Sequence, residues 1–355
     1  EEGKFPQAAE KLQGSRAMET DKGRLAVLSL QLGNCYYGMR QFSRALELYA
    51  EALREARAAG DQEGEASALG SIGNAYLETP SGSGEARGRN VRTAVDSYQA
   101  ALRIFHKLEY PMGYAMTQNN LGTALGDLPA ASPQERADNV RLAIAAYRQA
   151  LAVFRKEQYP VQYAGTQNNL GTALRDLPAA SPQGRADNVR GAVAAYQEAL
   201  EIRRKDQYPV DYAMTQNNLG NALMDLPAAS PQERADNVNK AVAAYQEALE
   251  IRRKDQYPVQ YAATQNNLGN ALRDLPAASP QERAANVRGA IAAYREALEV
   301  RRKDQYPVDY AMTQNNLGAA LTDLPAASPQ ERADNVSLAI AAYRQALAVF
   351  RKEQY

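Results

Sequence analysis

Apolar residues recur at intervals of three and four along this chain. After Pro111 they fall at Tyr114, Leu121 and Leu125, a spacing that places them on one face of a helix. Proline suits the first position of a helix, and the Leu128-Pro129 step disfavours its continuation. The pattern therefore predicts a helix that begins at Pro111 and ends at Leu128.

A second helix is predicted directly downstream. Ser132, Pro133 and Glu135 form a capping box, in which the Ser and the Glu three residues later satisfy free backbone N–H groups. An unbroken apolar stripe follows at Ala137, Val140, Ile144, Tyr147, Leu151 and Phe154. We expect one helix over 133–157, about 37 Å long at 1.5 Å per residue. The alternative is a shorter helix that is capped at Asp138 or Asn139 after a separate turn.

This pair of helices repeats along the chain. The segment Thr-Gln-Asn-Asn-Leu-Gly begins at Thr117, Thr166, Thr215, Thr264 and Thr313, a step of 49 residues. Fifteen of the 17 prolines and 16 of the 21 tyrosines follow the same step, so these prolines mark helix ends instead of a loop-rich chain. A fixed period of this size indicates a stacked array and not two or three ordinary globular domains.

The N-terminal third fits the same plan with different spacings. Leu32-Gly33-Asn34 and Ile72-Gly73-Asn74 mark two first helices, the segment 79–84 is a flexible loop, and residues 3–19 form a lone second helix. We expect fifteen helices in an all-α solenoid. The expected divisions are an orphan second helix at 1–21 and seven two-helix repeats at 22–60, 61–109, 110–158, 159–207, 208–256, 257–305 and 306–355.

Composition excludes most catalytic chemistry. The chain has one Cys and one His, which leaves no disulfide framework, no multi-Cys zinc site and few catalytic triads. Cys35 is interpreted as a small buried residue, and His106 as a surface residue that ends a second helix. No phosphate-binding loop or dinucleotide motif occurs, so we expect no enzyme activity, no cofactor and no metal.

The charge pattern and the hydropathy limit the classes of partner that are expected. Lys+Arg and Asp+Glu both number 41, which disfavours a nucleic-acid partner. The Arg-Arg-Lys runs at Arg203, Arg252 and Arg301 lie at helix ends, where cations offset the helix dipole, and are interpreted as structural. No apolar run is long enough to span a membrane and no signal peptide is seen, so a cytoplasmic location is expected.

The residues resemble a tetratricopeptide repeat array. Leu32-Gly33, Tyr36, Ala45, Tyr49 and Ala52 fall at that family's 34-residue spacing. Later copies keep Leu121-Gly122, Ala143, Tyr147, Ala150 and Leu151, but insert about nine residues between the helices and about six between the units. The long units are similar to kinesin light chains and to arrays beside bacterial caspase-like or NTPase domains, and the first units to the Pins/LGN type. The resemblance implies a right-handed superhelix that binds protein segments on its concave, first-helix surface.

Asparagines supply the candidate site on that surface. Asn119 and Thr123 lie one turn apart and face away from the Leu121 and Leu125 stripe. An Asn amide can both donate to and accept from a peptide unit, so a ladder of them could hold an extended chain by its backbone. The alternative for Asn119 and its copies is bonding within the array, which is the interpretation we favour for Asn120 and its copies. The candidate residues are Asn34, Asn74, Asn119, Thr123, Asn168, Thr172, Arg175, Asn217, Asn221, Asn266, Asn270, Arg273 and Asn315.

The stretches of 43 residues that begin at Thr117 and Thr313 differ at only three positions, so the registers at which the copies do vary are informative. Gly126, Arg175, Met224, Arg273 and Thr322 share one register, and Met116, Gly165, Met214, Ala263 and Met312 share another. Both registers lie on the side of Asn119, so they could select among partners; the alternative is that exposed positions drift freely.

The expected function is a peptide-binding scaffold. The alternatives are a regulatory array that controls a peptidase-like or NTPase effector domain elsewhere in a longer protein, and, less favoured, RNA binding. Gly3 begins inside a unit and Tyr355 stops at the Tyr of a Tyr-Pro junction, so the sequence is expected to be part of a longer protein. Exposed apolar residues on a last helix without a cap could drive end-to-end self-association. They are Tyr343, Leu347 and Phe350.

Overall fold

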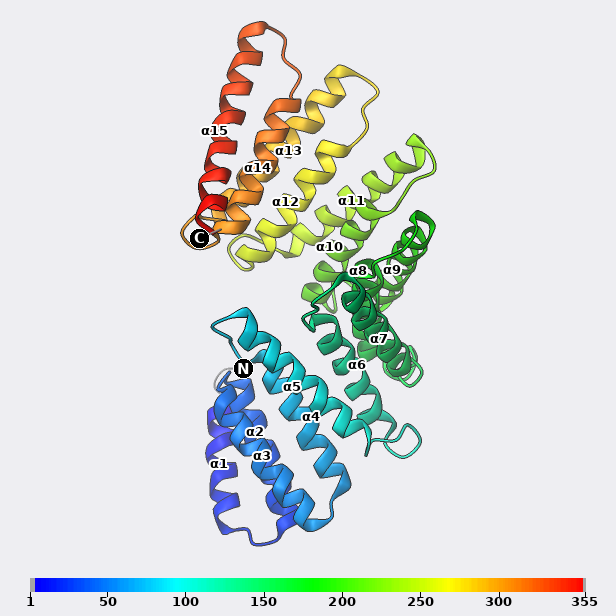
Figure 1. The fold of residues 1–355 in the computed structure, drawn as a ribbon, viewed down its shortest axis with the longest axis vertical. Helices are drawn as coiled ribbons and strands as arrows, with labels where there is room; N and C mark the ends of the chain where they lie inside the picture. Colours follow the sequence, from blue (N-terminus) through cyan, green and yellow to red (C-terminus); the bar gives the residue numbers. More distant parts are fainter. Residues whose placement is uncertain (1–3, 354–355) are drawn as a thin grey trace. The chain divides into compact units, whose positions relative to one another are not determined.

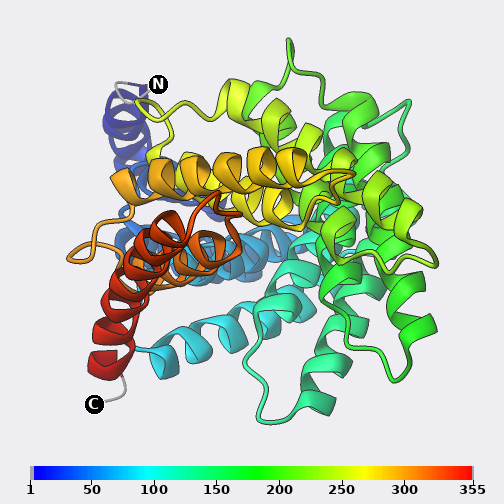
Figure 2. The same cartoon turned by 90° about the horizontal axis from the view of Figure 1, so that it is seen from above.

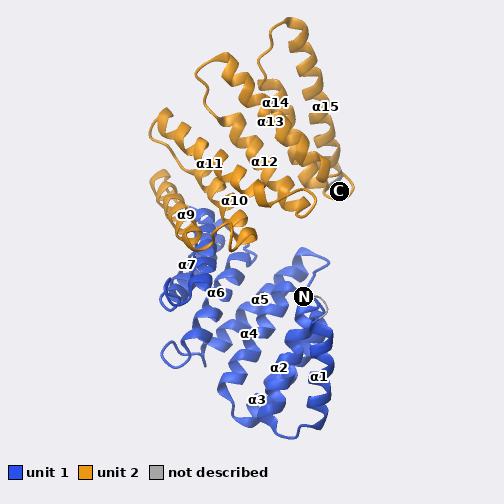
Figure 3. Ribbon diagram, turned by 180° about the vertical axis from the view of Figure 1, so that it is seen from behind, with its two compact units in different colours: residues 1–178 blue, residues 179–355 orange. Residues whose placement is uncertain are grey.

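The computed structural model describes residues 4–353, and in that range every regular element is an α-helix (Figures 1 and 2). The chain divides into two compact units, residues 1–178 and 179–355 (Figure 3). Unit 1 holds α1 (Lys4–Met18), α2 (Lys22–Gly38), α3 (Phe42–Ala59), α4 (Gln62–Glu78), α5 (Gly84–Leu102), α6 (Pro111–Asp127), α7 (Pro133–Leu151) and α8 (Pro160–Asp176). Unit 2 holds α9 (Pro182–Ile202), α10 (Pro209–Asp225), α11 (Pro231–Ile251), α12 (Pro258–Asp274), α13 (Pro280–Val300), α14 (Pro307–Asp323) and α15 (Pro329–Glu353).

The described residues contain the fifteen helices that were predicted, and the predicted starts at Pro111 and Pro133 are confirmed. The even-numbered helices are the first helices of each repeat and the odd-numbered ones are the second helices. The helix α7 begins at Pro133 as expected, with Ser132 Oγ accepting from Glu135 N at 3.1 Å. Glu135 Oε2 in turn accepts from Ala131 N at 2.7 Å, which satisfies a further free donor ahead of the helix. The alternative start at Asp138 or Asn139 is wrong.

The predicted end of the second helices is also wrong. The helix α7 ends at Leu151 instead of Glu157, because the chain turns there to begin α8 at Pro160. The turn buries Phe154, which is 2% exposed, against Ala115 and Ala150. Only α15 runs for the predicted 25 residues, and no first helix follows it in the described range. The helix α5 similarly ends at Leu102, so His106 lies in the turn after it and is exposed.

Within each unit the helices form two layers. The second helices that have a first helix of their own unit on both sides in sequence pack between those two helices; they are α3, α5, α7, α11 and α13. Successive first helices also approach one another, α2 with α4, α4 with α6 and α6 with α8 in unit 1, and α10 with α12 and α12 with α14 in unit 2. Backbones of successive second helices do not come as close in the described range. Within each unit the first helices are therefore the more closely packed layer.

A glycine in six of the described first helices lets the following second helix approach closely. A Cβ placed on Gly122 would lie 2.7 Å from Cε1 of Tyr147, closer than real Cβ contacts. Gly33, Gly73, Gly220, Gly269 and Gly318 stand in the same relation to the Tyr of their own repeat. Tyr147 is 4% exposed, which confirms that this tyrosine series belongs to the core. The glycine is therefore a packing requirement in these six repeats.

An arginine near the start of most second helices ties neighbouring repeats together. In unit 2, Arg234 Nη1 donates to the carbonyl of Met224 at 2.6 Å, and Nη2 lies 3.4 Å from Asp274 of the next first helix. Arg87 bonds Leu77 O and pairs with Asp127 at 3.1 Å in the same way in unit 1. This interaction was not predicted from the sequence, although its Arg and Asp recur with the 49-residue step.

The last second helix leaves an apolar face open in the described range. Phe350 is 37% exposed, whereas its copy Phe154 is 2% exposed because α8 and the turn before it pack over that position. Tyr343 and Leu347 are open in the same way. The end-to-end association expected of this face stays a prediction.

Candidate functional site

The first helices carry a repeated asparagine–tyrosine pair. The Oδ1 atom of Asn221 accepts from the Tyr245 hydroxyl at 2.7 Å, and Asn270 accepts from Tyr294 at the same distance. In unit 1 the corresponding bonds are Asn34 with Tyr49 at 2.8 Å and Asn74 with Tyr98 at 2.6 Å. Thr123 replaces the Asn in the third repeat, and its Oγ1 lies 3.1 Å from the Tyr147 hydroxyl. The buried tyrosine thus fixes the orientation of the polar residue above it.

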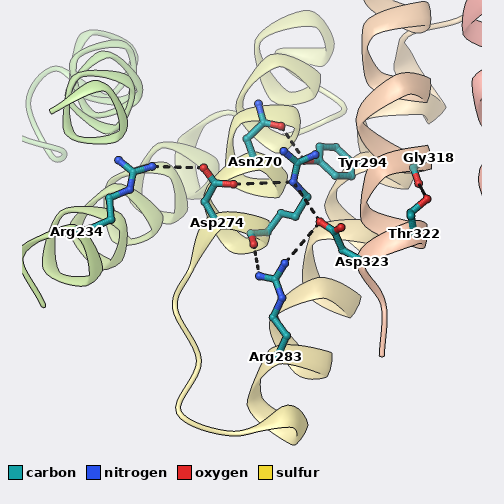
Figure 4. Close-up of polar contacts among 9 residues, drawn as sticks. Arg234, Asn270, Asp274, Arg283, Tyr294, Gly318, Thr322 and Asp323 are labelled. Atoms are coloured by element: carbon teal, nitrogen blue, oxygen red, sulfur yellow. Dashed lines mark hydrogen bonds and ion pairs between the residues drawn. The ribbon is translucent and has the colours of Figure 1, made fainter. Parts of the chain in front are cut away.

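This orientation leaves one end of each amide free. Nδ2 of Asn74, Asn221 and Asn270 makes no hydrogen bond in the described range, and none of these three atoms is among the buried unpaired ones. Figure 4 shows the Asn270 nitrogen pointing away from Tyr294, to which its oxygen is bonded. Each such residue therefore presents two N–H donors at the open face of a first helix.

The neighbouring asparagines link first helices to one another. Asn119 Oδ1 accepts from Thr166 Oγ1 of the next first helix at 3.1 Å, and Asn119 Nδ2 donates to Asn120 Oδ1 at 3.1 Å. Asn217 Oδ1 accepts from Thr264 Oγ1 at 3.1 Å in the same manner. Asn120 Nδ2 reaches back to Asn74 Oδ1 at 3.0 Å. Both asparagines of the Asn-Asn pair thus take part in an interhelical ladder within each unit.

Some asparagines of this interhelical ladder are buried, whereas others are exposed. Asn168, Asn217 and Asn266 are buried, and Asn266 Oδ1 accepts from Asn316 Nδ2 at 3.2 Å. Asn315 is exposed. For the buried members the array itself already uses the amide groups, so a partner would meet the ladder mainly through its exposed neighbours. Thr123 and Met116 are such neighbours, and Met116 is 51% exposed.

The remaining candidates lie at the C-terminal ends of the first helices. Arg175 is half-buried and lies 3.3 Å from Asp176, and Thr172 is half-buried with its Oγ1 donating to Asn168 O at 3.2 Å. Arg273 Nε lies 3.9 Å from both Asp274 Oδ1 and Asp323 Oδ2. These arginines are held against acidic side chains at the edge of the open face.

The basic runs have structural partners. Arg203 Nη1 donates to Thr215 Oγ1 at 2.9 Å and its Nη2 lies 3.5 Å from Asp211, which ties a second helix to the next first helix. Burial lowers the pKa of Arg203, and the carboxylate of Asp211 opposes that shift. Lys205 pairs with Glu247 at 3.0 Å and with Glu250. These cations are engaged by the array, so they do not form an open track for phosphates.

The described residues offer few other candidates for a reactive group or a metal site. Cys35 is buried, and burial raises the pKa of its thiol, which lowers its reactivity as a nucleophile. Over residues 4–353 no group of three or more His, Cys, Asp or Glu residues is placed to hold a metal ion. None of the described helices is both long enough and apolar enough to cross a membrane.

The tyrosine series predicts a loss of stability in alkali. Burial raises the pKa of Tyr147 to about 12, and it also raises the pKa of Tyr49, Tyr98 and Tyr294. A raised pKa means that the fold favours the protonated phenol, so this stabilisation is complete below the unfolded value near pH 10 and is lost as the pH rises towards 12. We expect helicity, followed by circular dichroism, to fall between about pH 10 and 12 together with a late tyrosinate absorbance step. Titration of all tyrosines near pH 10 with full helicity would contradict the burial.

Neither a protein-family model nor a curated protein sequence gives a significant match to the chain. Solved structures do match. The apo form of RapI aligns over 93% of this chain and 98% of its own, with a TM-score of 0.55 and 14% identity. A signal-transduction ATPase with a tetratricopeptide repeat sensor from Pyrococcus horikoshii aligns over 94% of this chain and 45% of its own, with a TM-score of 0.55 and 12% identity. The Cut9–Hcn1 structure aligns over 95% and 52%, with a TM-score of 0.50 and 15% identity. At these identities the likeness shows the fold: the chain is a tetratricopeptide-type helical repeat array.

Proposed function

We propose that this tetratricopeptide-type array is a scaffold that binds an extended segment of a partner protein along the open face of its first helices. The observation that carries the proposal is the asparagine whose oxygen is fixed by a buried tyrosine while its nitrogen is free. It recurs at Asn34 and Asn74 in unit 1 and at Asn221 and Asn270 in unit 2. No catalytic role is part of this proposal.

Oriented amide donors suit the backbone of a peptide. A main-chain carbonyl has two lone pairs, and an extended segment offers carbonyls at regular intervals. Because Tyr245 and Tyr294 already hold the asparagines in place, binding costs little side-chain entropy. The variable side chains next to them, such as Met214 and Met224, would then contact the side chains of the partner. The asparagine donors, which would bond the peptide backbone, give the affinity in this scheme, and the variable positions give the selectivity.

The array itself supplies the variant that tests this proposal. Thr123 occupies the Asn position in the third repeat and still contacts its tyrosine. The double variant Asn221→Thr and Asn270→Thr should therefore keep the tyrosine contacts while removing four N–H donors. Linear peptides would first be selected against the wild-type chain from a random displayed library, and their affinity for the variant would then be measured. With about 1 kcal/mol for each lost hydrogen bond, we expect at least a tenfold weaker affinity.

Two controls accompany this comparison. Circular dichroism and thermal unfolding of the double variant should match the wild type, which shows that the fold is intact. A second variant, Asn239→Thr on the exposed side of α11, should leave affinity unchanged. If the double variant binds the selected peptides as tightly as the wild type does, the amide donors do not hold the partner.

A regulatory role is the second candidate. It is favoured by the likeness to the ATPase that carries a tetratricopeptide repeat sensor, which extends over nearly all of this chain. In such a protein the same face would sense a segment and pass the signal to an effector domain. The two functions differ in the complete reading frame, where the regulatory role requires an effector domain beside the array.

A further inference from the structure

The first-helix face of unit 1 contains a cavity of about 190 Å³ between α6 and α8. Its floor is formed by Val140 and Tyr147 of α7, and Asp127 and Asp176 stand at its edge. The cavity exists because residue 126 is a glycine: a Cβ placed there would meet nothing within 4 Å.

Other repeats place a side chain at this register. The equivalent residues are Leu77, Met224 and Arg273. Leu77 packs against the core cluster that contains Val95 and Tyr98, so a residue at this register does turn into the space above the second helix. The third repeat alone has glycine here, and its cavity is the space that the array itself fills elsewhere.

In the sixth repeat an arginine side chain stands at the position of Gly126. Arg273 Nε lies 3.9 Å from Asp274 Oδ1 and 3.9 Å from Asp323 Oδ2. Asp127 and Asp176 occupy the same two positions 147 residues earlier, and Tyr147 corresponds to Tyr294. The third repeat thus keeps both carboxylates of the site but lacks the guanidinium that lies between them in the sixth repeat.

Existing ion pairs do not close the cavity to a cation. Asp127 Oδ2 pairs with Arg87 at 3.1 Å and Asp176 Oδ1 with Arg175 at 3.3 Å. Asp274 shows that one carboxylate can serve two arginines, because its Oδ2 pairs with Arg234 at 3.4 Å while Oδ1 faces Arg273. Arg136 is the one guanidinium among the residues that line the cavity, and it donates to Gly126 O. With Arg87 and Arg175 included, three guanidinium groups already face the two carboxylates, so a cationic occupant would bind through their second oxygens, Asp127 Oδ1 and Asp176 Oδ2, as the second oxygen of Asp274 faces Arg273.

We propose that this cavity binds the side chain of an arginine in the partner segment. The guanidinium would lie between Asp127 and Asp176, as that of Arg273 lies between Asp274 and Asp323, and the aliphatic part would lie over Val140. A planar guanidinium can bond two carboxylates at once, which a lysine ammonium does less well. The inference rests on the proposed peptide-binding function and assigns an arginine to one position along the bound segment.

Blocked pentapeptides Ala-Ala-X-Ala-Ala, with X as Arg, its neutral analogue citrulline, or Met, test this site by NMR titration. The Arg peptide should shift the amide signals of 123–127 and 169–176 and should bind at least tenfold more tightly than the other two. Gly126→Arg, which copies the sixth repeat, should abolish these shifts without loss of helicity. Arg273→Gly should open a second site with the same preference.

Several outcomes would overturn the proposal. They are equal or tighter binding of the citrulline or Met peptide, binding that Gly126→Arg leaves unchanged, and no shift with any peptide. Failure of this proposal is distinguishable from failure of the scaffold function. Library peptides whose binding needs Asn221 and Asn270 but is unchanged by Gly126→Arg would rule out the arginine site alone. Absence of any Asn-dependent peptide would remove the scaffold function.

Discussion

Gly122→Ala should lower the free energy of unfolding by about 2 kcal/mol, while Gly126→Ala, one turn later in the same helix, should raise it by up to about 1 kcal/mol. The two substitutions are chemically identical and differ only in what the new methyl group meets. At Gly122 it would lie 2.7 Å from the Tyr147 ring, and at Gly126 nothing lies within 4 Å.

The Tyr147 ring has little room to move away from such a methyl group. It is 4% exposed and packs in the cluster that includes Leu121, Val140 and Ile144. Moving the ring also displaces its hydroxyl from Thr123, 3.1 Å away. Overpacking of a core costs about 1–3 kcal/mol, and the lost hydrogen bond adds about 1 kcal/mol. The gain in helix propensity from Gly to Ala, about 1 kcal/mol, offsets only part of this.

Urea denaturation followed by circular dichroism measures both changes. Because repeat arrays need not unfold in one step, hydrogen exchange of the α6 and α7 amides should accompany it. Gly122→Ala should speed exchange in these two helices, and Gly126→Ala should not. An array that tolerates Gly122→Ala as well as it tolerates Gly126→Ala would show that the glycine is not a packing requirement.

Replacing Ala130, Ala228, Ala277 and Ala326 together by serine should raise the free energy of unfolding by about 3–4 kcal/mol, at about 1 kcal/mol for each site. The reason is that, in each of four second helices, the buried side-chain amide nitrogen of an asparagine lacks a hydrogen-bond partner. Nδ2 of Asn139, Asn237, Asn286 and Asn335 is buried and makes no hydrogen bond.

The second repeat shows how that donor is satisfied. Asn90 corresponds to Asn139, and its Nδ2 donates to Ser81 Oγ at 3.2 Å. Ser81 corresponds to Ala130, so the later repeats have lost the acceptor and kept the donor. A buried donor without a partner costs about 1–3 kcal/mol, and a serine at the alanine position restores the bond already present in the second repeat.

The urea midpoint of the four-serine variant tests this expectation. Ala131→Ser, at the exposed neighbouring position, is the matched control and should have no effect. Ser81→Ala should lower stability by about 1 kcal/mol, since it creates the same unpaired donor in the second repeat. A four-serine variant no more stable than the wild type would show that these asparagines already have partners, such as water.

Local signals in the sequence were sufficient to predict where the helices begin. Proline at the first position and Ser132 with Glu135 mark where α7 begins, because capping depends on residues close in sequence. The end of α7 at Leu151 was not predictable from the same stripe, because Phe154 continues the helical spacing while it packs in a turn. Burial against Ala115 of the preceding first helix decides that end, and this is a tertiary contact.

The sequence placed the candidate residues on the first helices but did not show what each side chain contacts. Spacing places Asn119 and Thr123 on one face, yet it cannot show that Asn119 bonds to Thr166 of the next repeat while Thr123 contacts Tyr147. Those partners lie 47 and 24 residues away, and the near-identical copies offer little variation from which to infer them. The cavity at Gly126 was visible only as a variable register. In the structure, Gly126 lines a cavity of about 190 Å³ that is also lined by Asp127 and Asp176.

The central claim is that tyrosine-oriented asparagine donors hold a polypeptide segment on the first-helix face. The most direct test is the Kd of one library-selected peptide, measured by isothermal titration calorimetry, for the wild type and for the Asn221→Thr/Asn270→Thr variant. We predict a Kd at least about tenfold higher for the variant, with an unchanged melting temperature. Equal Kd values for two equally stable proteins would contradict the claim.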